Sequence, residues 1–334
     1  MSIEVQLAGD RGLEKWDEWL LDARGGTFFH QLDVLNVIEK HSSSTLHRLV
    51  GYKGEHPVGL FPIFELSKGP IDTAFSPPPN LGIPTLGPVL LNSENLKQRK
   101  FEKRNQRFID GALDWIEDRV SPKYVHLQSS PSYDDPRPLS WAEFDVAPRH
   151  TYHVDISVGE EEVMNRFKSS LRSDIRRSQD EDFEIERGDE NDIRFVIEKV
   201  RERYEAQDKT YRISPEYAID LRRAVGTDQL PVYTGSIDGE LVSGMLNPRF
   251  GSTVHFWQGG GKPDVSLPMN DLIHWRIIRD AIDEGYTTYD LVGANTERLC
   301  RYKSKFNPAL RTYYSMTDGM TGMNAAAKLY RKFR

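Results

Sequence analysis

The chain has 334 residues, of which 38% are hydrophobic and 28% are charged, and its formal net charge is −7 at pH 7. This length predicts two domains, whereas the negative charge argues against a protein that binds nucleic acid over a whole basic domain. The single cysteine, Cys300, excludes an internal disulfide, and no apolar run fits a membrane span or a signal peptide, so we expect a cytoplasmic protein.

The first part of the chain predicts a mixed α/β domain. Leu13, Trp16 and Leu20 recur at helical spacing, and residues 53–55 (KGE) form a turn between two β-prone segments. The proline-rich stretch 76–79 cannot lie inside a helix, so it is either a surface crossing or a wall of a pocket. The elements expected here are helices over 13–20, 27–38 and 97–120, and strands over 46–52, 58–66 and 124–128.

A second series of elements begins at Thr151. Residues 164–175 carry apolar side chains at helical spacing, and Lys168, Arg172 and Arg176 follow at intervals of four residues on the same predicted helix. Such a basic row is either a phosphate-binding face or a solvated one. The other elements expected here are strands over 152–156, 183–187 and 254–258, helices over 193–205 and from residue 214, and a hairpin with strands over 230–237 and 240–247.

The last third of the chain holds the segment where we expect chemistry. Apolar residues at helical spacing predict a helix over 272–282 that ends at Gly285. A strand is expected over 286–292, and it carries the carboxylate of Asp290. The polar loop expected after this strand holds three cations, Arg301, Lys303 and Lys305.

Two hairpins share a pattern. Gly54-Glu55 is followed by Gly59-Leu60, and Gly239-Glu240 is followed by Gly244-Met245 at the same spacing. Either this similarity is chance, or the chain holds two copies of one mixed α/β unit. The matched order of predicted helices and strands around each hairpin favours two copies.

The order of these motifs resembles that of the FemAB-like acyltransferases, which are double-domain members of the GNAT superfamily. The resemblance covers most of the chain, from about residue 27 to residue 314. It implies an α/β fold of mixed sheets with two tandem GNAT-like domains, 1–149 and 150–318, the second carrying the active site, and a basic C-terminal helix over 319–334. The residues that carry the resemblance are Asn270, Leu272, His274, Trp275, Gly285, Tyr289, Asp290, Gly293, Ala294, Lys303 and Phe306.

The resemblance implies acyl transfer to an amine. Some members of the family move an amino acid from aminoacyl-tRNA onto a peptidoglycan precursor, and others resemble acetyltransferases that use acyl-CoA. The coenzyme A signature of single-domain GNAT enzymes is missing, because the run 258–261 (QGGG) is followed by Lys262 and Pro263. We therefore expect an N-acyl or aminoacyl transferase acting on a cell-envelope or glycan precursor, with aminoacyl-tRNA or acyl-CoA as donor and no permanently bound cofactor.

Two other functions stay open. One is an acyl-CoA-dependent N-acetyltransferase acting on a sugar or polysaccharide precursor, and the other is a non-catalytic pair of GNAT domains that binds a ligand or a partner. No contact with DNA is expected. The basic residues near the C-terminus allow peripheral contact with an anionic membrane or with RNA, as an alternative to a solvated helix end; they are Lys328, Arg331, Lys332 and Arg334.

By this resemblance, Lys303 and Asp290 are the expected catalytic residues, and no metal site is expected. Lys303 should lie on a loop and stabilise an oxyanion or grip a substrate phosphate, while Asp290 accepts a proton or orients the amine. The plainer alternatives are a solvated lysine and an aspartate that forms a turn or an ion pair. His255 and Trp257 should share one face of a strand. The expected substrate-binding residues are Arg301, Lys305, Arg172, Arg176, Asn270, His255 and Trp257.

Overall fold

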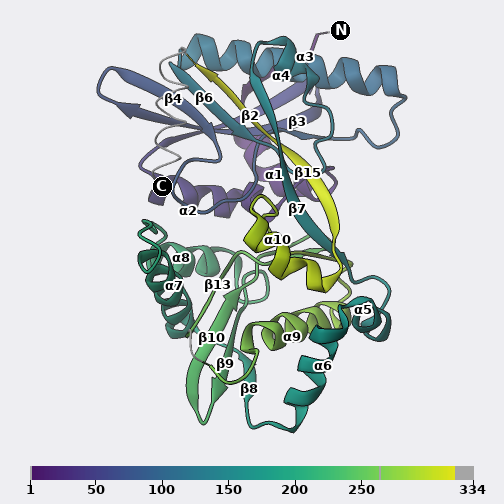
Figure 1. Cartoon of the computed structure of the whole chain (residues 1–334). Helices are drawn as coiled ribbons and strands as arrows, with labels where there is room; N and C mark the ends of the chain where they lie inside the picture. The colour runs from purple at the N-terminus through teal and green to yellow at the C-terminus, as the bar shows by residue number, and fades with distance from the viewer. Residues whose placement is uncertain (1, 263–264, 320–334) are drawn as a thin grey trace. The chain divides into compact units, whose positions relative to one another are not determined.

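The computed structural model of the chain describes residues 2–262 and 265–319. The chain divides into two compact units, which Figure 1 shows with their helices and strands. The described residues of unit 1 are 2–149 and 312–319, and unit 2 is His150–Arg311. No helix in the described ranges combines the length and hydrophobicity that a membrane crossing needs.

The limits of the units differ from the expected domains at one end. The first division follows Arg149, where the sequence placed the domain boundary. The second unit ends at Arg311 instead of residue 318, because the last residues of the final strand, from Ser315 to Gly319, pair with a strand of unit 1. The expected basic helix is not described, since residues 320–334 lie outside the described ranges.

Unit 1 is a mixed sheet with helices packed on it. Its strands have the order β1-β2-β3-β4-β6-β15, with β5 paired to β3, and only β4 and β6 run parallel among the pairs of this unit. Its strands are β1 (Glu4–Leu7), β2 (Thr45–Lys53), β3 (His56–Lys68), β4 (Ile71–Ser76), β5 (Val89–Leu90), β6 (Tyr124–Gln128) and β15 (Ala309–Gly319). Its helices are α1 (Asp10–Leu21), η1 (Phe28–His30), α2 (Leu32–Ser42), α3 (Gln98–Arg119) and α4 (Arg137–Trp141).

Unit 2 contains two groups of strands. One group has the order β7-β14-β12-β11 and the other β13-β10-β9-β8. The strands are β7 (Asp145–Asp155), β8 (Glu184–Arg187), β9 (Val232–Ile237), β10 (Glu240–Leu246), β11 (Arg249–Phe250), β12 (Thr253–His255), β13 (Gln258–Gly261) and β14 (Thr288–Asp290). The helices are α5 (Glu160–Arg166), α6 (Ser169–Arg177), η2 (Ser178–Asp180), α7 (Glu190–Glu205), α8 (Pro215–Val225), α9 (Met269–Asp283), α10 (Glu297–Lys303) and η3 (Ser304–Phe306).

The glycines shared by the two predicted hairpins make room for helices. In unit 1, a Cβ on Gly59 would lie 2.4 Å from the ring of Phe108 on α3. In unit 2, a Cβ on Gly244 would lie 2.5 Å from Cγ2 of Val196 on α7. Since real Cβ contacts are never that short, each hairpin needs glycine where a helix side chain packs directly on its backbone.

One predicted helix of unit 2 is in fact two. The sequence favoured a single helix over 164–175, but Phe167 and Lys168 have ψ angles of 152° and 141° and separate α5 from α6. Because of this break, Lys168 precedes α6 while Arg172 and Arg176 lie within it. The expected continuous row of three basic side chains on one helix face is therefore wrong.

The expected polar loop before Phe306 is also wrong, because the chain there forms α10 and η3. The hairpin predicted around Asp238-Gly239 is confirmed as β9 and β10. The helix predicted to end at Gly285 is confirmed as α9, and Gly285 has the left-handed φ of 85° that glycine tolerates best.

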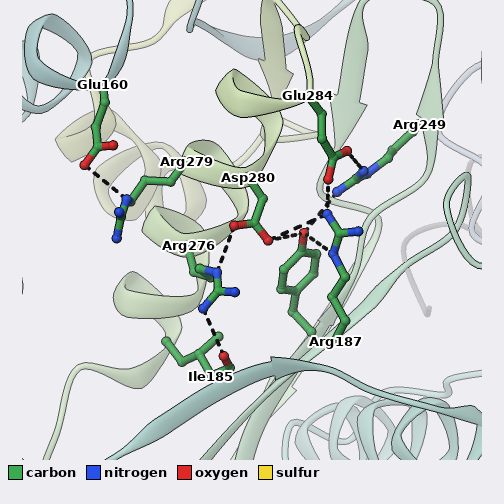
Figure 2. A network of polar contacts seen from close by, with 9 residues as sticks. Glu160, Ile185, Arg187, Arg249, Arg276, Arg279, Asp280 and Glu284 are labelled. Carbon is green, nitrogen blue, oxygen red and sulfur yellow. Dashed lines mark hydrogen bonds and ion pairs between the residues drawn. The ribbon is translucent and has the colours of Figure 1, made fainter.

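The C-terminal end of α9 is tied to the sheet by a network of charges, drawn in Figure 2. Glu284 pairs with Arg187 from β8 and with Arg249 from β11. The hydroxyl of Tyr233 accepts from both guanidinium groups, at 3.1 and 3.0 Å, and donates to Asp280 at 2.9 Å. The Arg249 side chain is only 2% exposed, so its charge depends on these partners.

Substitution of Glu284 tests this dependence. Glu284→Ala leaves the buried Arg249 without its carboxylate, and breaking a buried ion pair costs about 3–5 kcal/mol. We expect urea unfolding to show a loss of about 3 kcal/mol, at the low end of that range because Glu284 is partly exposed. Glu297→Ala is the matched control, because Glu297 and its partner Arg301 are 86% and 80% exposed, and its loss should stay below about 1 kcal/mol. Equal losses in the two variants would contradict the prediction.

Candidate active site

The candidate site begins where two parallel strands part. β12 pairs with β14 over three residues, and the pairing ends with His255 opposite Asp290. The amide of Phe256 then donates to the carbonyl of Asp290 at 2.8 Å, but the amide of Trp257 donates to Leu246 at 3.1 Å. The chain has crossed to the other group of strands, where β13 pairs with β10. The strand predicted over 254–258 is therefore divided, and His255 and Asp290 lie side by side at the ends of their strands.

Asp290 is a buried carboxylate with polar contacts at both oxygens. Its Oδ1 accepts from the hydroxyl of Thr151 at 2.5 Å and from the amide of Val292 at 2.8 Å. Its Oδ2 lies 3.3 Å from Nδ1 of His255 and 3.6 Å from Nε2 of His153. Burial alone would raise the pKa of Asp290, but the two imidazoles outweigh burial and hold this pKa far below its usual range. Asp290 therefore stays ionised at neutral pH, which suits an orienting role better than proton acceptance.

His255 is oriented by this carboxylate. When Nδ1 of the neutral ring donates its proton to Asp290, Nε2 carries the free lone pair. The side chain is 13% exposed, and among the described residues none bonds to Nε2. The ring nitrogen that can accept a proton is thus the one that the protein leaves without a partner.

Lys303 lies at the same place but is not on an exposed loop. It is the last residue of α10, it is 4% exposed, and its ammonium donates to the carbonyls of Val292 and Gly293, the latter at 2.9 Å. Both carbonyls belong to a turn with left-handed φ angles of 49° and 80°, and a β-branched residue such as Val292 rarely adopts that conformation. Burial lowers the pKa of Lys303 to about 8, although the charge of Asp290 opposes this shift.

Lys305 and Asn270 occupy a second polar cluster at the start of α9. The ammonium of Lys305 contacts both oxygens of Asp271 at 2.6 Å, and the hydroxyl of Tyr302 donates to the same carboxylate at 2.8 Å. Asn270 accepts from the hydroxyl of Ser243 at 2.7 Å. Asn270, Asp271, Ser243 and Tyr302 help to line a cavity of about 210 Å³ there, together with Lys262.

Four other expected binding residues lie apart from these two clusters. Arg301 is 80% exposed and pairs with Glu297. Arg172 donates to the backbone carbonyls of Asn165 and Phe167, while Arg176 is exposed on α6. Trp257 is buried against Tyr217, with ring centroids 5.9 Å apart, and does not share a strand with His255. Packing and backbone bonding are thus the structural roles of Trp257 and Arg172.

Two residues of the site were not predicted from the sequence. Thr151 and His153 both contact Asp290 from β7. They are two residues apart on a strand that the sequence did predict from residue 152, so the alternation of side chains places them on one face. The two-residue spacing of Thr151 and His153 is visible in the sequence. Its link to the site is not, because that link depends on the register of β7 against β14, which places His153 opposite Asp290.

The glycine run after Trp257 has a packing role. A Cβ on Gly260 would lie 2.8 Å from the backbone nitrogen of Val200 on α7, so glycine lets this helix approach β13. Gly259 and Gly261 are paired with β10. These residues are thus part of a covered strand, in keeping with the absence of a coenzyme A signature from the sequence.

Comparison with known proteins identifies the fold. Residues 165–304 match the family described as "Acetyltransferase (GNAT) domain". The crystal structure of FemX superimposes with a TM-score of 0.73 and 13% identity, over 93% of this chain and 96% of FemX. The L-PGS structure from Bacillus licheniformis gives a TM-score of 0.59 and 12% identity over 98% of both chains. A tandem GNAT protein of the clavulanic acid pathway gives 0.50 and 12%, over 95% of this chain and 97% of that one.

No curated protein sequence matches the chain. The structural matches nevertheless confirm the predicted fold class, a mixed α/β chain of two tandem GNAT-like units. The match of residues 165–304 to an acetyltransferase domain supports the predicted acyltransferase class.

The lowered pKa of Lys303 predicts how stability depends on pH. Between pH 8 and 10.5 the unfolded chain holds a proton that the folded chain has released, so this residue makes stability rise with pH in that window. The full rise is about 3 kcal/mol, at about 1.4 kcal/mol per pH unit. Urea unfolding of the wild type and Lys303→Met across this window should therefore show a smaller rise in the variant.

An exposed lysine gives the control for this measurement. Lys68, at the end of β3, is exposed, and Lys68→Met should follow the wild type at every pH. If the curves of Lys303→Met and the wild type run parallel from pH 8 to 10.5, Lys303 does not have the lowered pKa that its burial implies.

Proposed function

We propose that this chain, a FemAB-like acyltransferase of the GNAT superfamily, transfers an acyl or aminoacyl group to an amine of a cell-envelope or glycan precursor. The observation that carries the proposal is the pair formed by His255 and Asp290 beside the buried ammonium of Lys303. Amide formation from an ester or thioester needs a proton acceptor for the amine and a donor for the oxyanion. These three side chains supply both functions where the strands part.

His255 is the proton acceptor in this proposal. The neutral amine attacks the donor carbonyl, the new N–C bond forms, and the electrons of the C=O bond move to oxygen. Nε2 of His255 then takes the proton from the amine nitrogen, and Asp290 stabilises the resulting imidazolium. When the oxyanion collapses, the leaving group departs with the proton from His255, so the ring returns to its neutral state.

Lys303 supplies positive charge at a fixed place. Two of its three N–H groups donate to Val292 and Gly293, which leaves one N–H for a ligand. We assign this donor to the oxyanion, and a phosphate of the substrate is the alternative. Because both anchoring carbonyls lie in a left-handed turn next to Asp290, the ammonium needs no rearrangement when the charge develops.

The start of α9 bears on the identity of the donor. A helix N-terminus usually favours a phosphate, but here the carboxylate of Asp271 lies in the first turn and lines the cavity. This helix start is thus already occupied by a carboxylate and its partner Lys305, and we take this as support for an aminoacyl donor such as aminoacyl-tRNA over the pyrophosphate of coenzyme A. CoA-dependent N-acetyl transfer to a sugar or polysaccharide precursor is the second candidate, since the matched domain is described as an acetyltransferase. Both donors are cytoplasmic and neither is a permanently bound cofactor.

Donor binding separates these candidates before any acceptor is known. A ligand at about 100 times its dissociation constant stabilises a protein by about 2.7 kcal/mol. We expect thermal unfolding to shift upward with aminoacyl-tRNA and to stay unchanged with acetyl-CoA. Stabilisation by acetyl-CoA alone would replace the first candidate with the second, and no stabilisation by either would favour a non-catalytic pair of GNAT domains.

Substitutions in the dyad test the mechanism once a donor is known. General-base catalysis contributes about 10²–10⁴-fold, so His255→Gln should lower kcat by at least about 10²-fold with little change in KM. Asp290→Asn should cause a similar loss, and the double variant should lose little more, because the two side chains act as one unit. His153→Gln is the matched control, since His153 lies near the same carboxylate, and it should cost less than about tenfold. Full activity of His255→Gln would exclude the proposed proton acceptor.

A further inference from the structure

A groove on the side of unit 2 is separate from both polar clusters of the candidate site. It lies between α6 and α9, and its cavity measures about 260 Å³. Its floor consists of five apolar side chains, Ile175, Phe183, Ile185, Leu272 and Trp275. Buried apolar surface of this kind favours the apolar part of a ligand.

Two guanidinium groups stand at the edge of this floor. Arg276 and Arg279 lie three residues apart on α9, so they point from successive turns to the same side. Figure 2 shows Arg276 held by Asp280 and by the carbonyl of Ile185, and Arg279 held by Glu160. The bonds to Asp280 and Glu160 start from Nε, at 2.8 and 3.0 Å.

These bonds leave outward-facing donors. Nη2 of Arg276 and both Nη atoms of Arg279 have no partner among the described residues, and the two side chains are 44% and 49% exposed. Arg279 is held through Nε alone, so its two Nη groups form an open fork, whereas Arg276 is held through Nε and Nη1 and offers only Nη2. A carboxylate matches such a planar fork with two parallel hydrogen bonds.

The charge of the groove distinguishes it from other cavities of the chain. Its lining includes the two arginines and no acidic residue. By contrast, a larger cavity of unit 1 is lined by two arginines, Arg24 and Arg137, but also by four carboxylates, those of Glu94, Glu102, Asp134 and Asp135. On a chain of net charge −7, an apolar floor with two cations at its edge is complementary to an anion with an apolar body.

We propose that this groove binds a small amphipathic carboxylate, with its aliphatic or aromatic body on the floor and its head on Arg276 and Arg279. At about 30 Å³ per water-sized group, the cavity holds about nine such groups. An anionic bilayer fits less well, because the groove is a hollow of about 260 Å³ lined by eight residues, of which only two are basic, and is not an extended basic face. The proposal does not depend on the acyl-transfer function.

Octanoate is a probe of suitable size for isothermal titration calorimetry on the full chain. We expect octanoate to bind, and 1-octanol, which has the same chain but no charge, to bind at least about tenfold more weakly, since a charged hydrogen bond is worth about 1.5–3 kcal/mol. Acetate, which has the head without the body, should not bind detectably. Equal binding of octanoate and octanol, or no binding of octanoate at millimolar concentration, would overturn the proposal.

Three variants place the ligand. Arg279→Gln should weaken octanoate binding about tenfold. Arg194→Gln is the matched control, because Arg194 and Arg279 are each 49% exposed and each pairs with one partly exposed glutamate, and it should leave binding unchanged. Gln179→Trp adds bulk from an exposed residue that lines the groove and should abolish binding without removing any core side chain.

The same variants show which results would contradict the proposed ligand site. Octanoate binding that survives Gln179→Trp, or that falls equally in Arg279→Gln and Arg194→Gln, would place the ligand elsewhere and overturn the proposal. Sedimentation of the chain with phosphatidylglycerol vesicles, without octanoate binding, would assign this face to a bilayer and would overturn it as well. Arg276 is left unchanged in this design because its bond to the carbonyl of Ile185 also holds α9 to β8.

Discussion

The candidate site depends on the short parallel pairing of β12 and β14. The two strands stay together only as far as His255 and Asp290, because the next residues of the first strand pair with β10 instead. Because the strands separate there, His255 and Asp290 lie next to each other although they are far apart in the sequence. In the described part of the chain, the turn after Asp290 has no neighbouring strand to bond its carbonyls. The ammonium of Lys303 bonds these carbonyls instead, with one hydrogen bond to Val292 and one to Gly293.

The buried charges of the site support one another. An isolated ion in a protein interior is costly, but Asp290 has four polar contacts and Lys303 has two carbonyls and the field of Asp290. The two charges are not equally stabilised: the pKa of Asp290 lies far below its usual range, so this residue stays ionised, whereas burial lowers the pKa of Lys303 to about 8. This is the pattern expected of acid–base chemistry, in which neighbouring groups are held in different protonation states.

The sequence predicted the elements of unit 2 better than the contacts of its site. Asp290 at the end of a strand, the helix ending at Gly285 and the hairpin at Asp238 all follow from local periodicity and turn chemistry. The burial of Lys303 does not, because a polar segment with three cations looks like a loop until its carbonyl partners are known. Likewise, the contact of His153 with Asp290 follows only from the register of β7 against β14, and a register between strands far apart in the chain cannot be derived from local sequence.

The most direct test of this account is the tautomer of His255, which nitrogen-15 NMR of histidine-labelled protein reports without any substrate. The His255 signals can be assigned by their absence from the His255→Gln spectrum. If Asp290 orients the ring, the neutral form carries its proton on Nδ1 and leaves Nε2 unprotonated, and Asp290→Asn weakens that preference. A neutral His255 protonated on Nε2 in the wild type would contradict the account, because the nitrogen assigned to accept the proton from the amine would already hold one.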